Sequence, residues 1–412
     1  MSDGSEHVAP LVEGPLDLAW DEVGAEWEHY LRRRLIERLG NASMYNQWFG
    51  PPHQETTHYD FRITDPVVEC YLRVVPDKAG AAILIVGPSE AAVNRDRVLW
   101  LDAVETSTGK IGSEHPEFSW YSLLTCEPVF DGEVQILETA ARIGTMQIEP
   151  SGVIYWEFQP DRASLDGLGE GWSSPIIVEG TDTGFNFHAA QLKAVARVAR
   201  LRALLSVVLD ERWVIKLSPL DRRIPVPQTH PEIGPSEHPQ DINRYAHKRV
   251  RLPEWLIDAW GRTEDQPELA NALAAYQEAL DIWDGHPSLA LVCLVGVVEG
   301  IGSRYQDLVR CTCCDDCQVN VGSGKRFRAA LSVVLTKKNA SPLMAAYSPR
   351  SETVHEGRLH GSELTAGAVG FGLTQADPQS DFEMGLIEEL RSAAREILLL
   401  GLRGELPTEK RW

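Results

Sequence analysis

Arg350 and His355 are the residues whose types and spacing best suit chemistry in this chain. They lie in the stretch YSPRSETVHEGRLHG, residues 347–361. Arginine is a permanent cation that can hold a phosphate through two nitrogens, and histidine can move a proton near neutral pH. Together they could cleave a phosphodiester without a metal. The alternative is a surface turn with a histidine at a helix end, because this spacing also arises by chance.

The residues before the arginine predict a helix start. We expect Pro349 near the first position with Ser348 as the cap. Arg350 would then lie in the first turn, where free backbone N–H groups also favour an anion.

The charges around this stretch favour a phosphate-bearing ligand. Residues 318–360 hold seven Lys and Arg against two Glu, a net charge of +5 in a chain whose net charge is −21. Three of the cations, Lys325, Arg326 and Arg328, are candidate RNA contacts. The alternative is that these cations are simply the solvated side of an amphipathic helix.

Four cysteines crowd into CTCCDDC, namely Cys311, Cys313, Cys314 and Cys317. Two C-x2-C spacings overlap there, and this spacing is typical of zinc ligands. Structural zinc sites usually join two separated pairs, however, so a thiol-rich or redox-active loop is the alternative.

Two further polar positions stand beside apolar runs. Glu299 ends the run LVGVVEG and needs a partner if it is buried, so it could orient a basic active-site residue. The stretch NVGSGKRF lacks the glycine and the Ser or Thr of a phosphate loop, and Ser323 reads better as a helix cap.

The composition limits the class of protein. The chain has 412 residues, 43% of them hydrophobic, which predicts a globular protein of two or more domains. The net charge of −21 argues against a protein that coats nucleic acid generally. The polar start MSDGSEHVAP does not read as a secretory signal, and the apolar run 289–298 is too short for a membrane span. We therefore expect a cytoplasmic protein without a membrane partner.

The pattern along the chain predicts an α+β fold. A helix is expected over 16–40 and another over 185–209, with a strand over 212–220. Short β-branched and aromatic runs predict strands of a largely antiparallel sheet at 58–66, 67–76, 81–87, 97–106 and 152–158.

A proline-rich segment suggests where the domain boundary lies. Six prolines fall within 219–239, which predicts a linker or strap over 219–250 between a β-rich domain, 1–218, and a helical bundle, 251–412. Within the bundle we expect helices over 267–283, 287–310, 323–338 and 380–404.

The C-terminal third resembles the HEPN superfamily, in particular its Apea-like branch. The resemblance rests on the ordered series AYQEALDIWDGHPSLALVCLVGVVEGIG, GSGKRFRAAL and YSPRSETVHEGRLHG followed by a long closing helix, and it covers about residues 265–405. HEPN domains are helical bundles, and many are metal-independent ribonucleases of defence and toxin systems that work as dimers.

This resemblance implies roles for several residues. Arg350 would hold the scissile phosphate and stabilise its developing charge, and His355 would be the general acid or base. The products would carry 2′,3′-cyclic phosphate and 5′-hydroxyl ends. The supporting residues would be Ser351, Glu299, Arg358 and His360. The partners would be RNA and a second copy of the bundle, with no cofactor needed for cleavage and structural zinc at the cysteines.

Two other functions remain open at this point. One is a non-catalytic HEPN scaffold that binds RNA, a nucleotide or a protein. Ser351 favours it, because active members often carry Asn, Asp or His after the arginine. The other is a zinc-dependent structural or redox sensor built on the cysteine loop.

Overall fold

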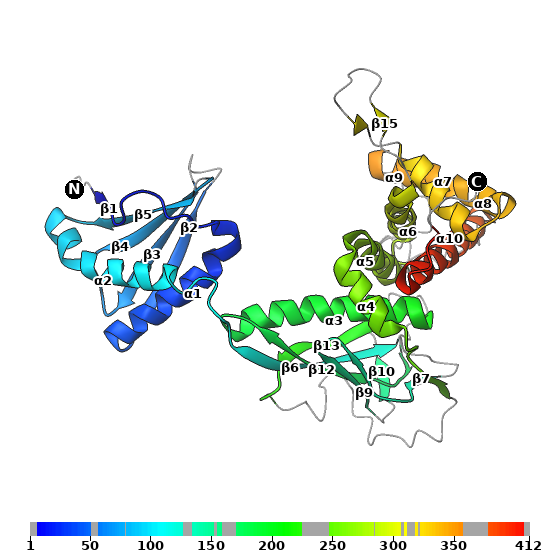
Figure 1. Cartoon of the computed structure of the whole chain (residues 1–412), viewed down its shortest axis with the longest axis horizontal. Helices are drawn as coiled ribbons and strands as arrows, with labels where there is room; N and C mark the ends of the chain where they lie inside the picture. Colours follow the sequence, from blue (N-terminus) through cyan, green and yellow to red (C-terminus); the bar gives the residue numbers. More distant parts are fainter. Residues whose placement is uncertain are drawn as a thin grey trace, which may run out of the picture. The chain divides into compact units, whose positions relative to one another are not determined.

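The chain folds into two compact units, which are shown as ribbons in Figure 1. The first comprises Met1–Glu117 and Thr183–Ala190, and the second Phe118–Asp182 and Gln191–Trp412. The computed structural model describes residues 6–50, 57–78, 80–126, 134–151, 155–158, 170–224, 247–283, 285–305, 309–310, 318–319, 322–356 and 378–407. Helices and antiparallel sheets are both present, which confirms the α+β class.

The first unit is one antiparallel sheet with two helices. The strand order is β1-β5-β4-β3-β2. The strands are β1 (His7–Pro10), β2 (Ser43–Phe49), β3 (His58–Asp65), β4 (Tyr71–Asp77) and β5 (Gly80–Gly87), and the helices are α1 (Trp20–Leu39) and α2 (Glu90–Thr108).

Both helices cover the same face of this sheet (Figure 1). In α1, Trp27, Leu31 and Leu35 recur every fourth residue and are fully buried. They share a core with alternate residues of the strands, such as Phe61 and Leu72, which point to the helix side.

The strand predicted over 97–106 is wrong, because these residues lie in α2. Ser89 caps the helix, its Oγ accepting from the N–H of Ala92 at 3.2 Å. Trp100, Ala103 and Val104 are buried at the three- and four-residue steps of a helix. The run VLWL resembles a strand by composition, but the cap and this longer spacing determine its structure.

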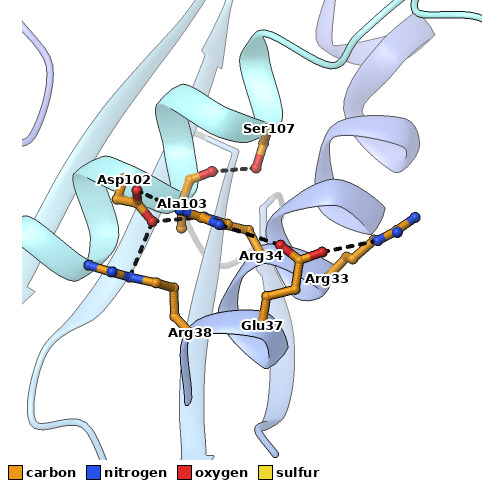
Figure 2. Close-up of polar contacts among 7 residues, drawn as sticks. All are labelled: Arg33, Arg34, Glu37, Arg38, Asp102, Ala103 and Ser107. Atoms are coloured by element: carbon orange, nitrogen blue, oxygen red, sulfur yellow. Dashed lines mark hydrogen bonds and ion pairs between the residues drawn. The ribbon is translucent and has the colours of Figure 1, made fainter. Parts of the chain in front are cut away.

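Ion pairs tie the two helices of this unit together (Figure 2). Arg34 of α1 donates twice to Asp102 of α2, at 2.9 and 3.0 Å, and Arg38 approaches the same carboxylate at 3.5 Å. Arg34 lowers the pKa of Asp102 by hydrogen bonding to its charged form. Arg33 and Arg34 also contact Glu37, so acids neutralise the arginines on this side.

The second unit begins with a five-stranded sheet of order β13-β6-β12-β9-β8. Its strands are β6 (Glu117–Cys126), β8 (Ala141–Ile143), β9 (Met146–Pro150), β12 (Ile176–Thr183) and β13 (Trp213–Asp221). The helix α3 (Phe187–Leu209) lies along one face (Figure 1). Two small pairs accompany the sheet: β10 (Tyr155–Phe158) with β11 (Glu170–Ser173), and β7 (Val134–Leu137) with β14 (His247–Val250). A third pair, β15 (Val309–Arg310) with β16 (Gln318–Val319), lies among the helices that follow (Figure 1).

The rest of this unit is a helical bundle. Its helices are α4 (Leu256–Asp265), α5 (Pro267–Ile282), α6 (Pro287–Gly302), α7 (Ser323–Val334), α8 (Lys337–Leu343), α9 (Tyr347–Glu356) and α10 (Pro378–Arg403), with the 3-10 turns η2 (Ser303–Tyr305) and η3 (Met344–Ala346). The helix predicted over 323–338 is interrupted at Leu335, which is extended, and Thr336 caps α8.

The helix α6 is the centre of the bundle and packs against α5, α7, α9 and α10. Among the described residues, Pro287–Tyr305 is long and apolar enough to cross a membrane, but half of this window is buried inside the protein. A core helix of a globular bundle has the same composition.

The observed division of the chain differs from the boundary predicted at 219–250. The second sheet shares one hydrophobic core with the bundle, in which Trp120 and Trp213 of the sheet cluster with Trp260 and Tyr276 of the helices. Arg202 of α3 also donates to Asp281 of α5 at 2.7 Å. Prolines mark where regular structure stops, whereas shared burial decides which elements form one unit. Residues 225–246 of the predicted linker lie outside the described part of the chain.

Substituting Gly302 should test the close approach of α6 and α7. A Cβ atom at this buried position would lie 2.1 Å from the backbone oxygen of Arg326, which cannot move independently of its helix. We expect Gly302→Ala to lower the free energy of unfolding by about 2–3 kcal/mol in urea titrations. Gly300→Ala is the matched control, because nothing lies within 4 Å of its added Cβ, and it should be neutral or stabilising. Equal effects of the two substitutions would contradict this packing.

Candidate functional site

Arg350 lies in α9, but not at the free helix start that the sequence predicts. The helix begins at Tyr347 and follows η3 directly. The N–H of Tyr347 donates to the oxygen of Met344, and Pro349 has no N–H. The first turn of α9 therefore offers few backbone donors, and an anion near Arg350 would depend on side chains.

Glu299 of α6 is the charged partner of Arg350. The Nη2 of Arg350 donates to the Oε2 of Glu299 at 3.3 Å, although the two residues are 51 positions apart. The side chains are only 21% and 13% exposed. Glu299 therefore contacts a basic residue, and its carboxylate limits where the guanidinium can point; its role in orienting an active-site residue stays a prediction.

Aromatic and hydroxyl groups complete the surroundings of Arg350. The guanidinium carbon lies 5.9 Å from the centre of the Tyr347 ring. The Tyr347 hydroxyl is in hydrogen-bond contact with the hydroxyl of Ser323, and its ring packs against Phe327 at 6.0 Å. Ser323 is the first residue of α7, after Gly322 at the cap position, so the prediction that Ser323 is the cap is wrong.

Three buried polar atoms at this site have unused hydrogen-bonding capacity. The Nε of Arg350, the Oε1 of Glu299 and the Oγ1 of Thr353 find no hydrogen-bond partner among the described residues. Leaving such atoms unsatisfied is costly, and native proteins usually satisfy them with protein, water or ligand. These three atoms therefore keep hydrogen-bonding capacity beside the guanidinium of Arg350.

His355 is in the same helix as Arg350, and the structure describes its backbone. Five residues along an α-helix correspond to a rotation of about 140° and a rise of about 7.5 Å. The two positions of the motif thus lie on different sides of α9. One copy of the helix does not present them as neighbours. The side chains of His355 and Ser351 lie outside the described part.

None of the described contacts of Arg350 is with the three predicted RNA contacts. Lys325 and Arg328 are exposed on α7, and neither forms an ion pair with a described residue. Arg326 is half-buried, with its backbone oxygen against Gly302.

Several predicted site residues lie outside the described part of the chain, namely Arg358, His360, Cys311, Cys313, Cys314 and Cys317. Within the described residues, no group of three or more His, Cys, Asp or Glu could hold a metal ion. The zinc prediction therefore stays a prediction.

Sequence reasoning missed Tyr347 and Thr353. Residues 347, 350 and 353 are spaced three apart, so they share one side of α9. This spacing was readable, but only the packing against α6 and α7 shows that the shared side faces Glu299 and Ser323.

The bundle also has an open pocket of about 570 Å³ between α7, α8 and α10. Leu335, Leu343 and Ala393 line it together with Lys338 and Glu389. None of the predicted site residues contributes to it.

Comparison of the chain with protein-family models, with curated proteins and with solved structures gave no match.

A double-mutant cycle should measure how strongly Glu299 and Arg350 depend on each other. Removing one partner leaves the other charge largely buried, so Glu299→Ala and Arg350→Ala should each lower the free energy of unfolding by about 2 kcal/mol. The double variant should be at least about 1 kcal/mol more stable than the sum of the single effects predicts, measured by urea unfolding.

The pair Arg304–Glu268 is the control, because it lies in the same bundle with side chains 32% and 38% exposed. Its coupling should stay below about 0.5 kcal/mol. Additive effects for Glu299 and Arg350 would show that the two side chains act independently.

Proposed function

We propose that the chain is a cytoplasmic, homodimeric HEPN-type endoribonuclease of the Apea-like branch, which cleaves RNA without a metal as a defence or stress effector. The observation that carries the proposal is the arrangement of Arg350. Its guanidinium is held by Glu299 and lies over Tyr347, while its Nε has no described partner. A cation fixed in this way is suited to binding a phosphate in one orientation.

The chemistry needs one phosphate-binding cation and one group that moves protons. Arg350 holds the scissile phosphate and stabilises the charge that develops on its oxygens. Neutral His355 takes the proton of the 2′-hydroxyl as the 2′-oxygen attacks phosphorus. The P–O5′ bond breaks, and a protonated histidine returns a proton to the 5′-oxygen. The products carry 2′,3′-cyclic phosphate and 5′-hydroxyl ends, and proton and charge balance without any other reactant.

The position of His355 on α9 makes a second copy part of the proposal. The positions of Arg350 and His355 are about 140° apart around α9. One copy of the helix therefore cannot point both side chains at the same phosphate. Two helices α9 related by a two-fold axis can bring the arginine of one protomer to the histidine of the other. Lys325 and Arg328 on α7 would then bind the flanking RNA backbone.

One observation favours a different function, a non-catalytic scaffold. Glu299 neutralises Arg350, so a substrate phosphate must compete with a carboxylate that is already in place. Ser351 after the arginine also departs from the usual active motif. A scaffold would bind RNA, a nucleotide or a protein at the same surface without cleaving it.

Cleavage of total RNA and tRNA in EDTA distinguishes the two functions. We expect wild type to cleave, with Arg350→Ala and His355→Ala each reducing the rate by at least about 100-fold. Product ends should show cyclic phosphate when analysed by mass spectrometry. Arg403→Ala is the control, because this arginine lies at the end of α10 over Trp255 and should leave the rate unchanged.

Cleavage that survives in both Arg350→Ala and His355→Ala would contradict the assignment of these residues. RNA binding by a wild type that leaves the RNA intact would instead support the scaffold.

A further inference from the structure

The sheet of the first unit has one face that no helix of this unit covers. Both α1 and α2 pack on the side of Phe61 and Leu72. Side chains alternate along a strand, so the residues between these positions form the opposite face. One row of this face runs across the strands through Tyr45, Arg62, Tyr71 and Val86, and the next through Gln47, Asp60, Arg73 and Leu84.

Exposed Tyr45 and Gln47 and half-buried Phe49 lie along β2, the outermost strand of this face. Tyr45 on β2 is 45% exposed. Phe49 stacks on His58 at a ring distance of 4.8 Å with planes 18° apart, which holds the phenyl ring in place. Gln47 is exposed between them, with an amide that can both donate and accept.

Arg62 provides a positive charge that no acid neutralises among the described residues. Its guanidinium carbon lies 3.7 Å from the centre of the Tyr71 ring, so the group is held against the aromatic face. The acid nearest along β3 is Asp60, which is 1% exposed and bound twice by Arg73, at 2.7 and 2.8 Å. The centre of this face therefore presents the guanidinium of Arg62, while the carboxylate of Asp60 is bound by Arg73 and that of Glu6 accepts from the Tyr71 hydroxyl at 3.1 Å.

The helix side of the same unit shows the contrast. There Arg34 and Arg38 are bound to Asp102, and Arg33 is bound to Glu37 (Figure 2). In a chain with 60 acidic and 39 basic residues, most exposed arginines can find a carboxylate. Arg62 differs from these three arginines, because it contacts an aromatic ring and forms no ion pair with a described residue.

We propose that this face of the first unit binds single-stranded nucleic acid. Unpaired bases would stack on Tyr45 and Phe49, Gln47 would contact a base edge, and the guanidinium of Arg62 would bind a backbone phosphate. Aromatic rings combined with a positive surface are the usual means of binding single strands. Duplexes keep their bases inside and cannot use the rings. The site lies outside the bundle, so it goes beyond the proposed cleavage and does not require it.

Fluorescence anisotropy with the full-length protein tests this site separately from cleavage. The probe is a short labelled oligouridine with 2′-O-methyl groups, which cannot undergo attack by the 2′-oxygen. A matching DNA strand and a duplex serve as comparisons. Wild type should bind both single strands more tightly than the duplex. Tyr45→Ala and Arg62→Ala should each weaken binding by roughly 5- to 100-fold. Arg62→Lys keeps the positive charge and should weaken binding less than Arg62→Ala does.

Two variants are the controls. Trp48→Ala removes an exposed ring from the helix side of the same strand, and Arg33→Ala removes an exposed positive charge from α1. Both should bind within about twofold of wild type. Thermal unfolding of each variant identifies any loss of fold.

The proposal would be overturned if Tyr45→Ala and Arg62→Ala both fold and bind as tightly as wild type does. It would also be overturned if wild type bound the duplex and the single strands with equal affinity. It would also fail if wild type bound no oligonucleotide but self-associated through this face. In that case sedimentation would show a dimer that Tyr45→Ala dissociates, and a second copy of the chain would be the occupant.

Discussion

The bundle depends on the burial of one almost entirely apolar helix, α6, whose single carboxylate must be satisfied inside the protein. Burying α6 requires α5, α7, α9 and α10 to surround it. Glu299 near its end is then 13% exposed, which would be unfavourable without a cation. Arg350 supplies that cation, and the need to pair them fixes how α9 lies against α6. The ion pair that offsets the burial of Glu299 thus also holds Arg350 in a defined orientation.

The first unit shows how the chain distributes its charges. Acids outnumber bases, and on the helix side each arginine of Figure 2 is bound to a carboxylate. On the open face of the sheet, Asp60 is withdrawn into a pair with Arg73, and Arg62 lies on Tyr71 instead. The local balance of charge on this face thus differs from the total charge of the chain.

Local patterns predicted most elements, and long-range packing explains the failures. The apolar spacing of α1, the prolines that begin α5 and α6, and the β-branched run of β5 all lie within single segments, so they can be recognised in the sequence. The error at α2 arose because VLWL suits a strand by composition, whereas the cap of the helix lies nine residues before Val98, at Ser89. The contact of Glu299 with Arg350 could be suspected from a lone carboxylate in an apolar run. The roles of Tyr347, Thr353 and Ser323 could not, since only tertiary packing brings α7 to α9.

The central claim is that Arg350 and His355 act together on one phosphate across two copies of the chain. Mixing two inactive variants tests it most directly. Arg350→Ala and His355→Ala, refolded together so that subunits exchange, form heterodimers in which one site regains both residues. The account predicts that the mixture recovers about a quarter of wild-type RNA cleavage in EDTA, although each variant alone is inactive. The claim would be contradicted if wild type cleaves, mass spectrometry shows that the heterodimer has formed, and the mixture is still as inactive as each variant alone.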